Sequence, residues 1–336
     1  MPDPPLPLLI TGIAGVAGFN ALHYFQSRYQ AKVTGIRQQN NWKLSGPGIV
    51  ACNAEDRDRL ENLFQQHRFA AVLNCAGNCA LRACELDPEL AWRTNVQGVE
   101  NLLKVLPEKV RLVHLSIDLV FSGRGQGGGN QGYVESNTPD PVTVYGKTMV
   151  TAEHLIAQQR PDACILRISL PMGISFNGHA GAIDWIQSRF RNSKPATLYF
   201  DEIRTPTYTD CLNRLFHNML VNDLAGVFHA GGPRRLSLYE IAQIVNRIGG
   251  YDPELLMGCP RGDAGPVPPR AGNVAMNSQL LAKELGHNPF SSWPYDDRFV
   301  PTDRNWHRDR PSGENGSLEK LKTVLYQNPL RESAND

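Results

Sequence analysis

The sequence lacks an excess of either charge. Its 336 residues contain 34 Lys and Arg against 33 Asp and Glu, a formal net charge of +1. Nucleic acids and anionic membranes are recruited by a strong positive field, so we expect neither as a partner. No run of apolar residues approaches the ~20 that span a bilayer. Hydrophobic residues at 41% and charged residues at 20% indicate instead a folded chain with a sizeable core.

Cysteines are few and odd in number, seven in all. An odd count in a chain of this length argues against a disulfide framework and favours a reducing compartment. Cys75, Cys79 and Cys84 have spacings that match no common zinc pattern, so we expect buried thiols and no metal site. The Pro-rich first residues, without basic side chains or a long apolar stretch, do not resemble a secretory signal. We therefore expect a cytoplasmic protein.

The first half of the sequence alternates short apolar runs with amphipathic stretches. We expect strands at 8–10, 32–36, 71–74, 111–116 and 164–168, and helices at 16–27, 57–66, 89–105 and 145–159. Strands that alternate with helices predict an α/β fold with a parallel, doubly wound sheet. The strands read as continuous apolar runs, which is typical of sheets covered by helices on both faces.

The second half mixes helical patterns with Pro- and Gly-rich joints, which predicts a smaller C-terminal α/β lobe. We expect residues 1–168 to form a nucleotide-binding domain and residues 169–300 a substrate-binding lobe interleaved with it. Residues 301–336 are polar and are expected to form a C-terminal tail. Residues 123–132 are so rich in glycine that we expect a loop that is mobile without ligand and covers the cleft.

The clearest motif is a glycine-rich turn directly after the first expected strand. Gly12, Gly15 and Gly18 have the spacing G-x-x-G-x-x-G. Such glycines permit a tight turn, a close approach of the backbone to a pyrophosphate, and close packing of the helix on the sheet. The N-terminus of the following helix offers N–H groups to the phosphates. The sequence therefore predicts a dinucleotide site here, with Ala14 and Val16 as further contacts.

The end of the second strand indicates which dinucleotide is preferred. NAD sites usually place Asp or Glu there to accept a hydrogen bond from the ribose 2′-hydroxyl. This chain has Arg37 at that point and no acidic residue nearby. A guanidinium offers a planar set of donors that suits a 2′-phosphate. The pattern favours NADP(H) over NAD(H); the alternative is an ordinary surface arginine.

Further motifs follow in a characteristic order. They are Leu73-Asn74-Cys75-Ala76-Gly77, Asn95-Val96-Gln97-Gly98, Ser116-Ile117-Asp118-Leu119-Val120-Phe121, Tyr145-Gly146-Lys147-Thr148, Arg204-Thr205-Pro206-Thr207 and Pro269-Arg270. With the glycine turn, they make the chain resemble an extended short-chain dehydrogenase/reductase of the dTDP-4-dehydrorhamnose reductase type. That subgroup also includes the regulatory β subunit of methionine adenosyltransferase. The resemblance implies a Rossmann-type fold and cofactor contacts from Asn53, Ala54, Cys75, Ala76, Gly77 and Tyr145.

The resemblance also implies catalysis by three side chains, of which this sequence keeps one. Tyr145 matches the proton donor, whereas Met149 stands at the lysine position and Ile117 at the Ser/Thr position. Lys147 is no simple substitute, because two residues along a helix turn the side chain by ~200°. Ser116 could supply the missing hydroxyl only if the strand shifted, since neighbours on a strand face opposite sides.

Two functions of different classes follow from these residues. The resemblance implies an NADP(H)-dependent reductase that acts on a nucleotide-activated keto-sugar or another small carbonyl compound. The departures at positions 117 and 149 favour instead a catalytically impaired, NADP-binding pseudoenzyme that regulates or scaffolds a partner. An epimerase or dehydratase is a weaker reading, because it also needs the Tyr–Lys pair. The sequence leaves open whether the chain forms a homodimer.

Overall fold

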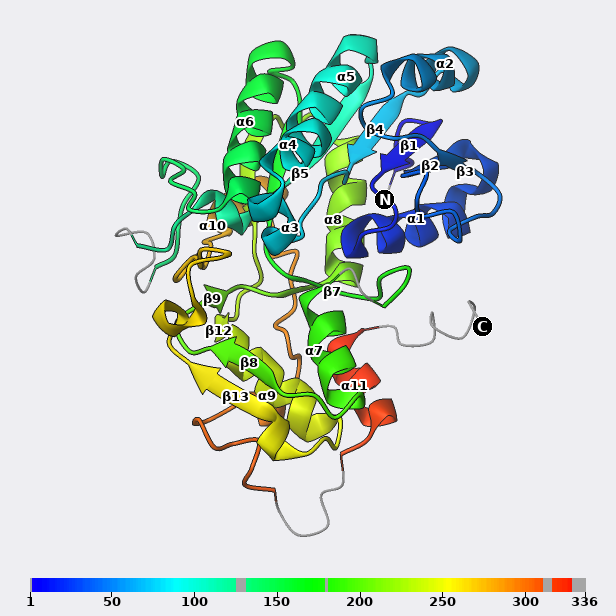
Figure 1. Ribbon diagram of the computed structural model, residues 1–336. Coiled ribbons are helices and arrows are strands. Elements are labelled where there is room, and N and C mark those ends of the chain that lie inside the picture. The colour runs from blue at the N-terminus through cyan, green and yellow to red at the C-terminus, as the bar shows by residue number, and fades with distance from the viewer. Residues whose placement is uncertain (1, 125–130, 179–180, 311–315, 328–336) are drawn as a thin grey trace.

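A parallel sheet forms the centre of the larger domain (Figure 1). The computed structural model describes residues 2–124, 131–178, 181–310 and 316–327. Within them, seven strands have the spatial order β11-β6-β5-β4-β1-β2-β3. They are β1 Leu8–Thr11, β2 Val33–Arg37, β3 Ile49–Ala51, β4 Ala71–Asn74, β5 Arg111–Ile117, β6 Cys164–Ile168 and β11 Gly226–Ala230. The predicted doubly wound α/β fold is confirmed, and its strand order reverses between β1 and β4, where such folds bind ligands.

Helices cover both faces of the sheet. On one face lie α1 Val16–Tyr29 and α8 Thr209–Val221; on the other lie α2 Arg57–His67, α5 Gly98–Val105 and α6 Val144–Gln159. Alternate strand residues pack into two separate cores, so that Leu8 and Ile10 belong to the first and Leu9 to the second. Burial on both faces explains why the strands read as continuous apolar runs.

The prediction of one continuous helix at 89–105 is wrong. It consists of α4 Pro88–Trp92, a π-helical turn at Arg93–Gln97, and α5. A Cβ at Gly98 would lie 2.6 Å from the Cβ of Ala54, so the glycine lets the chain at this junction pack closely on the loop after β3. π-Turns within helices often occur at functional sites. A further short helix, α3 Leu81–Leu86, precedes this segment and was not predicted.

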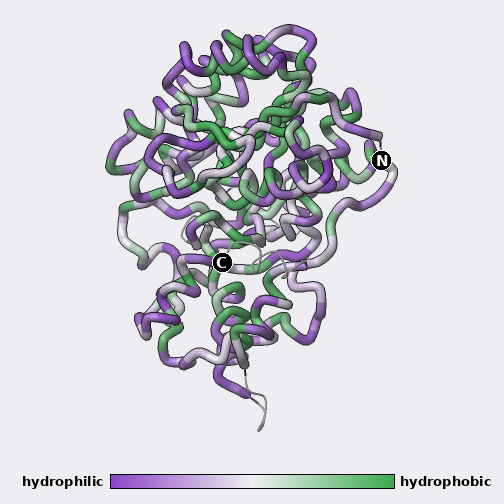
Figure 2. Tube along the Cα trace, turned by 90° about the vertical axis from the view of Figure 1, so that its right-hand side faces the viewer, coloured by the Kyte–Doolittle hydropathy of each residue, from purple (hydrophilic) through white to green (hydrophobic). Residues whose placement is uncertain are grey.

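A smaller lobe lies below the sheet domain in Figure 1. Its helices are α7 Ala182–Arg191, α9 Leu238–Ile248 and α11 Leu318–Leu325. Its strand pairs are β7 Pro171–Met172 with β10 Thr207–Tyr208, β9 Ile203–Arg204 with β12 Leu236–Ser237, and β8 Ala196–Tyr199 with β13 Leu256–Cys259. Figure 2 shows the same two parts from the side, with hydrophobic segments in the middle of the sheet domain.

The chain passes between the two parts more than once. Helix α8 and strand β11 lie within the range 169–300, yet they pack on and extend the central sheet. In the range after residue 300, the α11 side chains Leu321, Val324 and Leu325 are buried in the same core as α9. In the part of the chain that the structure describes, no helix is long and apolar enough to cross a membrane.

Candidate functional site

The glycine turn between β1 and α1 requires its glycines. Gly12 has φ +66°, and a Cβ there would lie 2.3 Å from the carbonyl oxygen of Cys75. A Cβ at Gly18 would lie 2.4 Å from the carbonyl oxygen of Gly12. Neither position has space for a larger residue. The turn after β1 and the loop after β4, predicted separately as cofactor contacts, thus lie against each other.

The start of α1 can accept a phosphate. Gly15 is the N-cap residue, it offers no capping side chain, and the first turn contains no acidic residue. The Gly15 N–H donates to the Gly12 carbonyl over 3.1 Å, which closes the turn. The N–H groups of the first helical turn, which include that of Val16, need a partner from outside the helix. Together with the helix dipole they form an anion site of the kind predicted for Ala14 to Val16.

A buried hydrogen-bond network holds the loop after β4 beside this turn. Thr11 Oγ1 donates to Asn74 Oδ1 over 2.5 Å and accepts from Ala76 N over 3.2 Å. The Asn74 amide donates to His114 Nδ1 over 2.9 Å, which places the ring proton on Nε2. Burial lowers the pKa of His114 to about 4, so the ring is neutral at pH 7. Sequence reasoning missed this network. The sequence feature that could have revealed it is that three apolar strands each contain a polar residue at or beyond their midpoint.

Arg37 and Asn53 lie at the ends of neighbouring strands, β2 and β3. Arg37 Nη1 donates to the Gln38 carbonyl oxygen over 3.0 Å. Its Nε is buried, and the described residues give it no hydrogen-bond partner. Asn53 Oδ1 accepts from Gln39 N over 2.9 Å and so holds the two loops together, with Ala54 next in the chain. Arg37, Asn53 and Ala54, which were predicted as cofactor contacts, therefore lie together at the carboxyl-terminal ends of β2 and β3.

Two side-chain hydrogen bonds fix the start of α6. Thr143 is the N-cap, and its Oγ1 accepts from Gly146 N over 2.9 Å. Glu85 of α3 accepts from Val144 N over 2.7 Å. The first turn of α6, which contains Tyr145, is therefore held from both sides.

Tyr145 is 7% exposed. The part of the chain that the structure describes gives its hydroxyl no hydrogen bond, yet the oxygen is not among the fully buried unpaired atoms. Burial raises the pKa of Tyr145 well above its usual value, and the neighbouring Cys79 and Asp118 add to the rise. Arg204 opposes the rise only weakly. The phenol is therefore protonated at neutral pH, which suits a proton donor.

At the two positions where the chain departs from the family pattern, 117 and 149, the side chains pack against apolar neighbours. Met149 is 4% exposed and packs, one helical turn from Tyr145, in a cluster that includes Cys84, Phe121 and Tyr133. Ile117 is half-buried against the same cluster. Lys147 is exposed, as expected from its position on the helix. Tyr145 therefore has no lysine from its own helix beside it.

Ser116 remains in the regular register of β5, opposite Arg167 of β6. Leu112 belongs to the core on the α5 and α6 side, and the alternation places Ser116 on that face. Its hydroxyl is buried without a hydrogen-bond partner among the described residues. The strand shift that a catalytic Ser116 would require is not present.

A buried group of charges was not predicted, although two of its residues, Asp118 and Arg204, belong to motifs noted above. Asp118 Oδ1 lies 2.5 Å from Arg204 Nη1, and Arg204 Nη2 lies 3.0 Å from Glu202 Oε1. Ser169 Oγ donates to Asp118 Oδ2 over 2.6 Å. Burial raises the pKa of Asp118, and Arg204 opposes this. The Arg204 guanidinium is thus shared between two carboxylates.

The predicted covering loop lies largely outside the described residues, because 125–130 are not among them. Its first residues are held in place by two contacts. Ser122 N donates to Asp140 Oδ1 over 2.8 Å. Gly123, at φ +71°, lies against the backbone of Gly272 and Asn273. The segment therefore joins the sheet domain to the residues near position 272.

All seven cysteines are free. The prediction of buried thiols is wrong at Cys79, which is exposed, and Cys75 is only partly buried. Both lie in the loop between β4 and α3. Cys75 packs against the core of the sheet domain, and Cys84, on α3, is fully buried. Among the described residues, no group of three or more His, Cys, Asp or Glu side chains could hold a metal ion.

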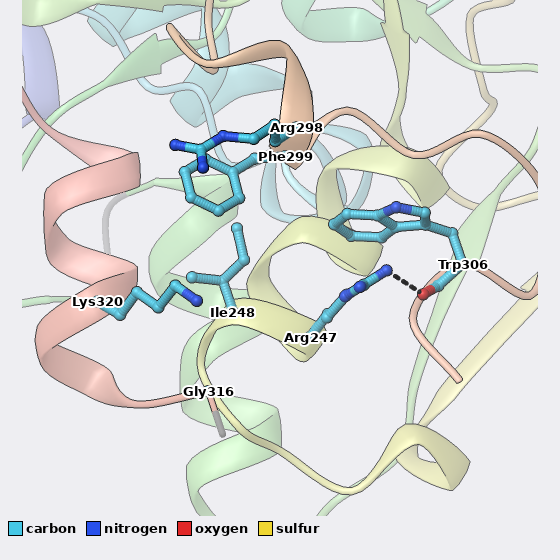
Figure 3. Close-up of a pocket in the computed structure, with 7 residues that line it drawn as sticks. All are labelled: Arg247, Ile248, Arg298, Phe299, Trp306, Gly316 and Lys320. Atoms are coloured by element: carbon cyan, nitrogen blue, oxygen red, sulfur yellow. Dashed lines mark hydrogen bonds between the residues drawn. The ribbon is translucent and has the colours of Figure 1, made fainter. Parts of the chain in front are cut away.

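Figure 3 shows a cavity in the smaller lobe, between α9, α11 and the segment around Trp306. Arg247 lies 4.3 Å over the Trp306 ring and donates to the Trp306 carbonyl oxygen over 2.9 Å. The cavity has a volume of about 10 Å³, enough for about one water molecule. It cannot hold a cofactor. The candidate cofactor site therefore rests on the glycine turn and the loops after β2, β3 and β4, and not on this cavity.

Comparison with known proteins agrees with this geometry. Residues 6–296 match the family model described as the RmlD substrate binding domain. A probable low-salt glycan biosynthesis reductase, Agl14, from Haloferax volcanii is 25% identical over 280 residues, covering 82% of this chain and 91% of the relative. Methionine adenosyltransferase 2 subunit beta from Danio rerio is 24% identical over 310 residues, covering 86% and 90%.

Among solved structures, dTDP-4-dehydrorhamnose reductase from Bacillus anthracis in complex with NADP has the same fold. The TM-score is 0.69 at 17% identity, and the match covers 95% of this chain and 98% of that one. The parallel sheet and the matched family model agree. The chain belongs to the family defined by the RmlD substrate binding domain, whose named members include dTDP-4-dehydrorhamnose reductases.

Proposed function

We propose that this protein is an NADP(H)-dependent reductase that acts slowly on a nucleotide-activated keto-sugar or a related carbonyl compound. The observation that supports it most is the combination of an uncapped helix start at Gly15 with a buried Tyr145 in the first turn of α6. The residues fit the cofactor. The glycine turn leaves backbone N–H groups for its phosphates, and Arg37 keeps a buried, unpartnered Nε beside the ribose position.

The cofactor would supply a hydride, and the protein would supply the proton. Tyr145 Oη would donate to the carbonyl oxygen of the substrate as negative charge develops there. The raised pKa keeps the phenol protonated but also makes it a weaker acid, which slows proton donation. Met149 offers no positive charge to the phenolate that remains after donation, and Ile117 offers no hydroxyl to the substrate oxygen. These losses slow the reaction.

The substrate class is taken from the family. Members are named dTDP-4-dehydrorhamnose reductase, and the Haloferax volcanii relative is named as a glycan biosynthesis reductase. These names are consistent with a nucleotide-activated sugar that carries a keto group as the substrate class. The chain covers 91% of the archaeal relative, so the similarity extends over both the sheet domain and the lobe.

A catalytically impaired, regulatory role is the second candidate, and one observation favours it. Met149 and Ile117 are both packed in an apolar cluster rather than merely substituted at an open surface. Tyr145 therefore lies among apolar neighbours, and the positive charge of Arg204 is neutralised by Asp118 and Glu202. A relative in Danio rerio is itself named as a subunit of another enzyme.

The two candidates are separated by binding and turnover on the same protein. Titration calorimetry should show tighter binding of NADPH than of NADH. A panel of nucleotide keto-sugars should then show at least one substrate that oxidises NADPH, at a rate below the usual enzyme range of roughly 1–10³ s⁻¹. Tight NADPH binding with no oxidation across the panel would favour the regulatory role. Absence of NADPH binding would contradict both candidates.

A further inference from the structure

Each of the four consecutive residues 199–202 in the smaller lobe interacts with a different arginine. The pairs are Tyr199 with Arg270, Phe200 with Arg304, Asp201 with Arg261, and Glu202 with Arg204. Two of these arginines lie on aromatic rings and two on carboxylates. The segment begins at the end of β8, which pairs with β13. Positive side chains from separate parts of the chain are thus gathered at one point of the lobe.

Arg270 is supported by an aromatic face and keeps hydrogen-bond donors unused. Its guanidinium carbon lies 4.6 Å from the centre of the Tyr199 ring. Such a stack uses the flat face of the guanidinium and leaves the N–H groups at its edge free. Arg270 Nε is buried and has no hydrogen-bond partner among the described residues. Glu202 Oε2, also buried and unpartnered there, lies 3.7 Å from Arg270 Nη1, so it attracts the guanidinium without a hydrogen bond.

Backbone contacts place Arg270 where the lobe meets the sheet domain. The next residue, Ala271, is buried in the same apolar cluster as Tyr145. Gly272 N donates to the Ser122 carbonyl oxygen over 2.8 Å, and Ser122 comes shortly after the carboxyl end of β5. Arg270 therefore lies on the lobe side of the residues that follow β5, next to the cluster that contains Tyr145.

This position is separate from the turn that suits the cofactor phosphates. The glycine turn follows β1, and β4 lies between β1 and β5 in the sheet. Neighbouring strands are ~4.8 Å apart, so the ends of β1 and β5 are separated by ~10 Å. A dinucleotide on the turn therefore leaves Arg270 open to a second anionic group.

The carboxylate beside Arg270 is fixed by a buried chain of charges. Glu202 is 1% exposed, and its Oε1 accepts from Arg204 Nη2 over 3.0 Å. Arg204 also donates to Asp118. A binding group whose supporting residues are already ordered loses little freedom when its ligand arrives. Glu202 and the Tyr199 ring thus hold the Arg270 guanidinium in place before any ligand binds.

We propose that Arg270 binds a phosphate group of the substrate, and that this phosphate belongs to the diphosphate of a nucleotide-activated sugar. The identity of the substrate rests on the proposed function. A guanidinium presents its N–H groups in one plane, which suits two oxygens of a phosphate. The diphosphate is attached directly to the sugar, so holding it beside the Tyr145 cluster keeps the keto group of that sugar near Tyr145. Arg270 therefore selects nucleotide-activated sugars over free sugars.

The first test measures the binding of dTDP and UDP to the full chain by titration calorimetry. Arg270→Met should weaken both by at least about tenfold, because a charge-assisted contact to the phosphate is lost. Thymidine has no phosphate, so its affinity should be the same for the two proteins. Unchanged diphosphate binding in a folded Arg270→Met protein, or no binding of dTDP and UDP to the parent, would overturn the proposal.

Arg304→Met is the matched control for this test. Arg304 stacks on an aromatic ring of the same segment, but that ring, Phe200, contacts Tyr239 of α9 within the lobe. Diphosphate binding should therefore change by less than about threefold in Arg304→Met, well below the effect of a lost charge-assisted hydrogen bond. An equal loss in both variants would assign the binding to general positive charge and overturn the role of Arg270.

Arg270→Lys guards the test against a folding defect. A lysine keeps a positive charge beside buried Glu202 but lacks the planar set of donors. Thermal melting of this variant should match that of the parent, whereas its affinity for dTDP should fall by at least about threefold. Parental affinity for dTDP in Arg270→Lys would show that no bidentate contact is made and would overturn the assignment.

Chemical modification tests the same contact in the unmodified chain. Phenylglyoxal reacts with accessible arginine side chains, and mass spectrometry locates the products. Saturating dTDP should slow the modification of Arg270 by at least about fivefold, because the bound form is protected. The side chain of Arg298, which is 83% exposed, is the internal reference and should react equally with and without dTDP. Equal modification of Arg270 in both conditions would contradict the contact.

Two further outcomes separate this proposal from the proposed function. Saturating dTDP should change the affinity for NADPH by less than about threefold, because the two ligands use different places. Competition between them would put the diphosphate on the glycine turn and overturn the role of Arg270. If dTDP binding depends on Arg270 but no keto-sugar is reduced, the reductase fails and the phosphate site stands. If a carbonyl compound without a nucleotide is reduced and neither diphosphate binds, the reductase stands and the phosphate site fails.

Discussion

Asp118 and Arg204 form an ion pair with 2.5 Å between Oδ1 and Nη1, and neither side chain is more than 4% exposed. The pair joins the residue after β5 to strand β9 of the lobe, 86 positions apart in the chain. A second bond from Arg204 to Glu202 shares the guanidinium between two carboxylates. The pair therefore fixes the lobe against the sheet domain directly beside Tyr145.

Removal of one partner should unfold the protein more easily. Arg204→Met leaves Asp118 buried without its counter-ion, and such losses cost about 3–5 kcal/mol. The matched control is Arg298→Met, which breaks the exposed pair with Asp296 and should leave the free energy of unfolding almost unchanged. Denaturant titration of both variants measures the difference. Equal effects would mean that the buried pair contributes no more than a surface pair.

Two glycines of the turn, Gly12 and Gly15, should respond differently to replacement by alanine. Gly12→Ala should destabilise the fold and abolish NADPH binding, because the new Cβ would lie 2.3 Å from the Cys75 carbonyl oxygen at φ +66°. Gly15→Ala meets its nearest atom at 3.5 Å and has an ordinary φ of −79°, so its melting temperature should stay close to that of the parent. Thermal melting distinguishes the two. A stable Gly12→Ala protein that binds NADPH would contradict the turn geometry.

The cofactor preference depends on Arg37. Arg37→Ala should weaken NADPH binding by about 1.5–3 kcal/mol, the range for a hydrogen bond to a charged group. The affinity for NADH should not change, because NADH has no 2′-phosphate for the guanidinium to bind. Titration calorimetry with both cofactors on both proteins measures this. Equal affinities for NADPH and NADH in the parent protein would sink the assignment.

Stability should depend on pH through His114. Burial lowers its pKa to about 4 in the folded protein, against 6.5 without burial. The unfolded chain therefore binds a proton that the folded chain does not between these values, and stability falls as pH falls through that window. The two values correspond to about 3 kcal/mol. Urea titrations at pH 7, 5.5 and 4 should show that the free energy of unfolding declines less in His114→Gln than in the parent protein. An identical decline in the two proteins would assign the effect to other groups.

Restoring the two absent side chains should accelerate reduction. Ile117→Thr with Met149→Lys would supply an oxyanion donor and a cation near Tyr145, and the rate with an accepted keto-sugar should rise at least ~100-fold. Met149 is buried in an apolar cluster, so a lysine there needs a check that NADPH still binds. Each single variant is a control and should gain less. An unchanged rate with intact NADPH binding would mean that these positions do not limit the reaction.

Local signals in the sequence predicted the framework of the site. The glycine spacing, the apolar strands and Arg37 are each set by residues near one another, so periodicity and spacing reveal them. The pairing of Asp118 with Arg204 depends on two distant segments meeting, which no periodicity encodes. Cys79 was misjudged because cysteine is usually buried, whereas its exposure depends on where the loop after β4 lies. The π-turn at 93–97 has a helical hydrophobic pattern and so resembles an ordinary helix.

The most direct test of the proposed reductase is the rate of NADPH oxidation with an accepted nucleotide keto-sugar, measured for the parent protein and for Tyr145→Phe. The substitution removes the one hydroxyl oxygen and retains the ring, so NADPH affinity should be preserved. If Tyr145 donates the proton, the rate should fall at least ~100-fold in Tyr145→Phe. An equal rate in the two proteins, with NADPH bound to both, would show that Tyr145 is not the proton donor.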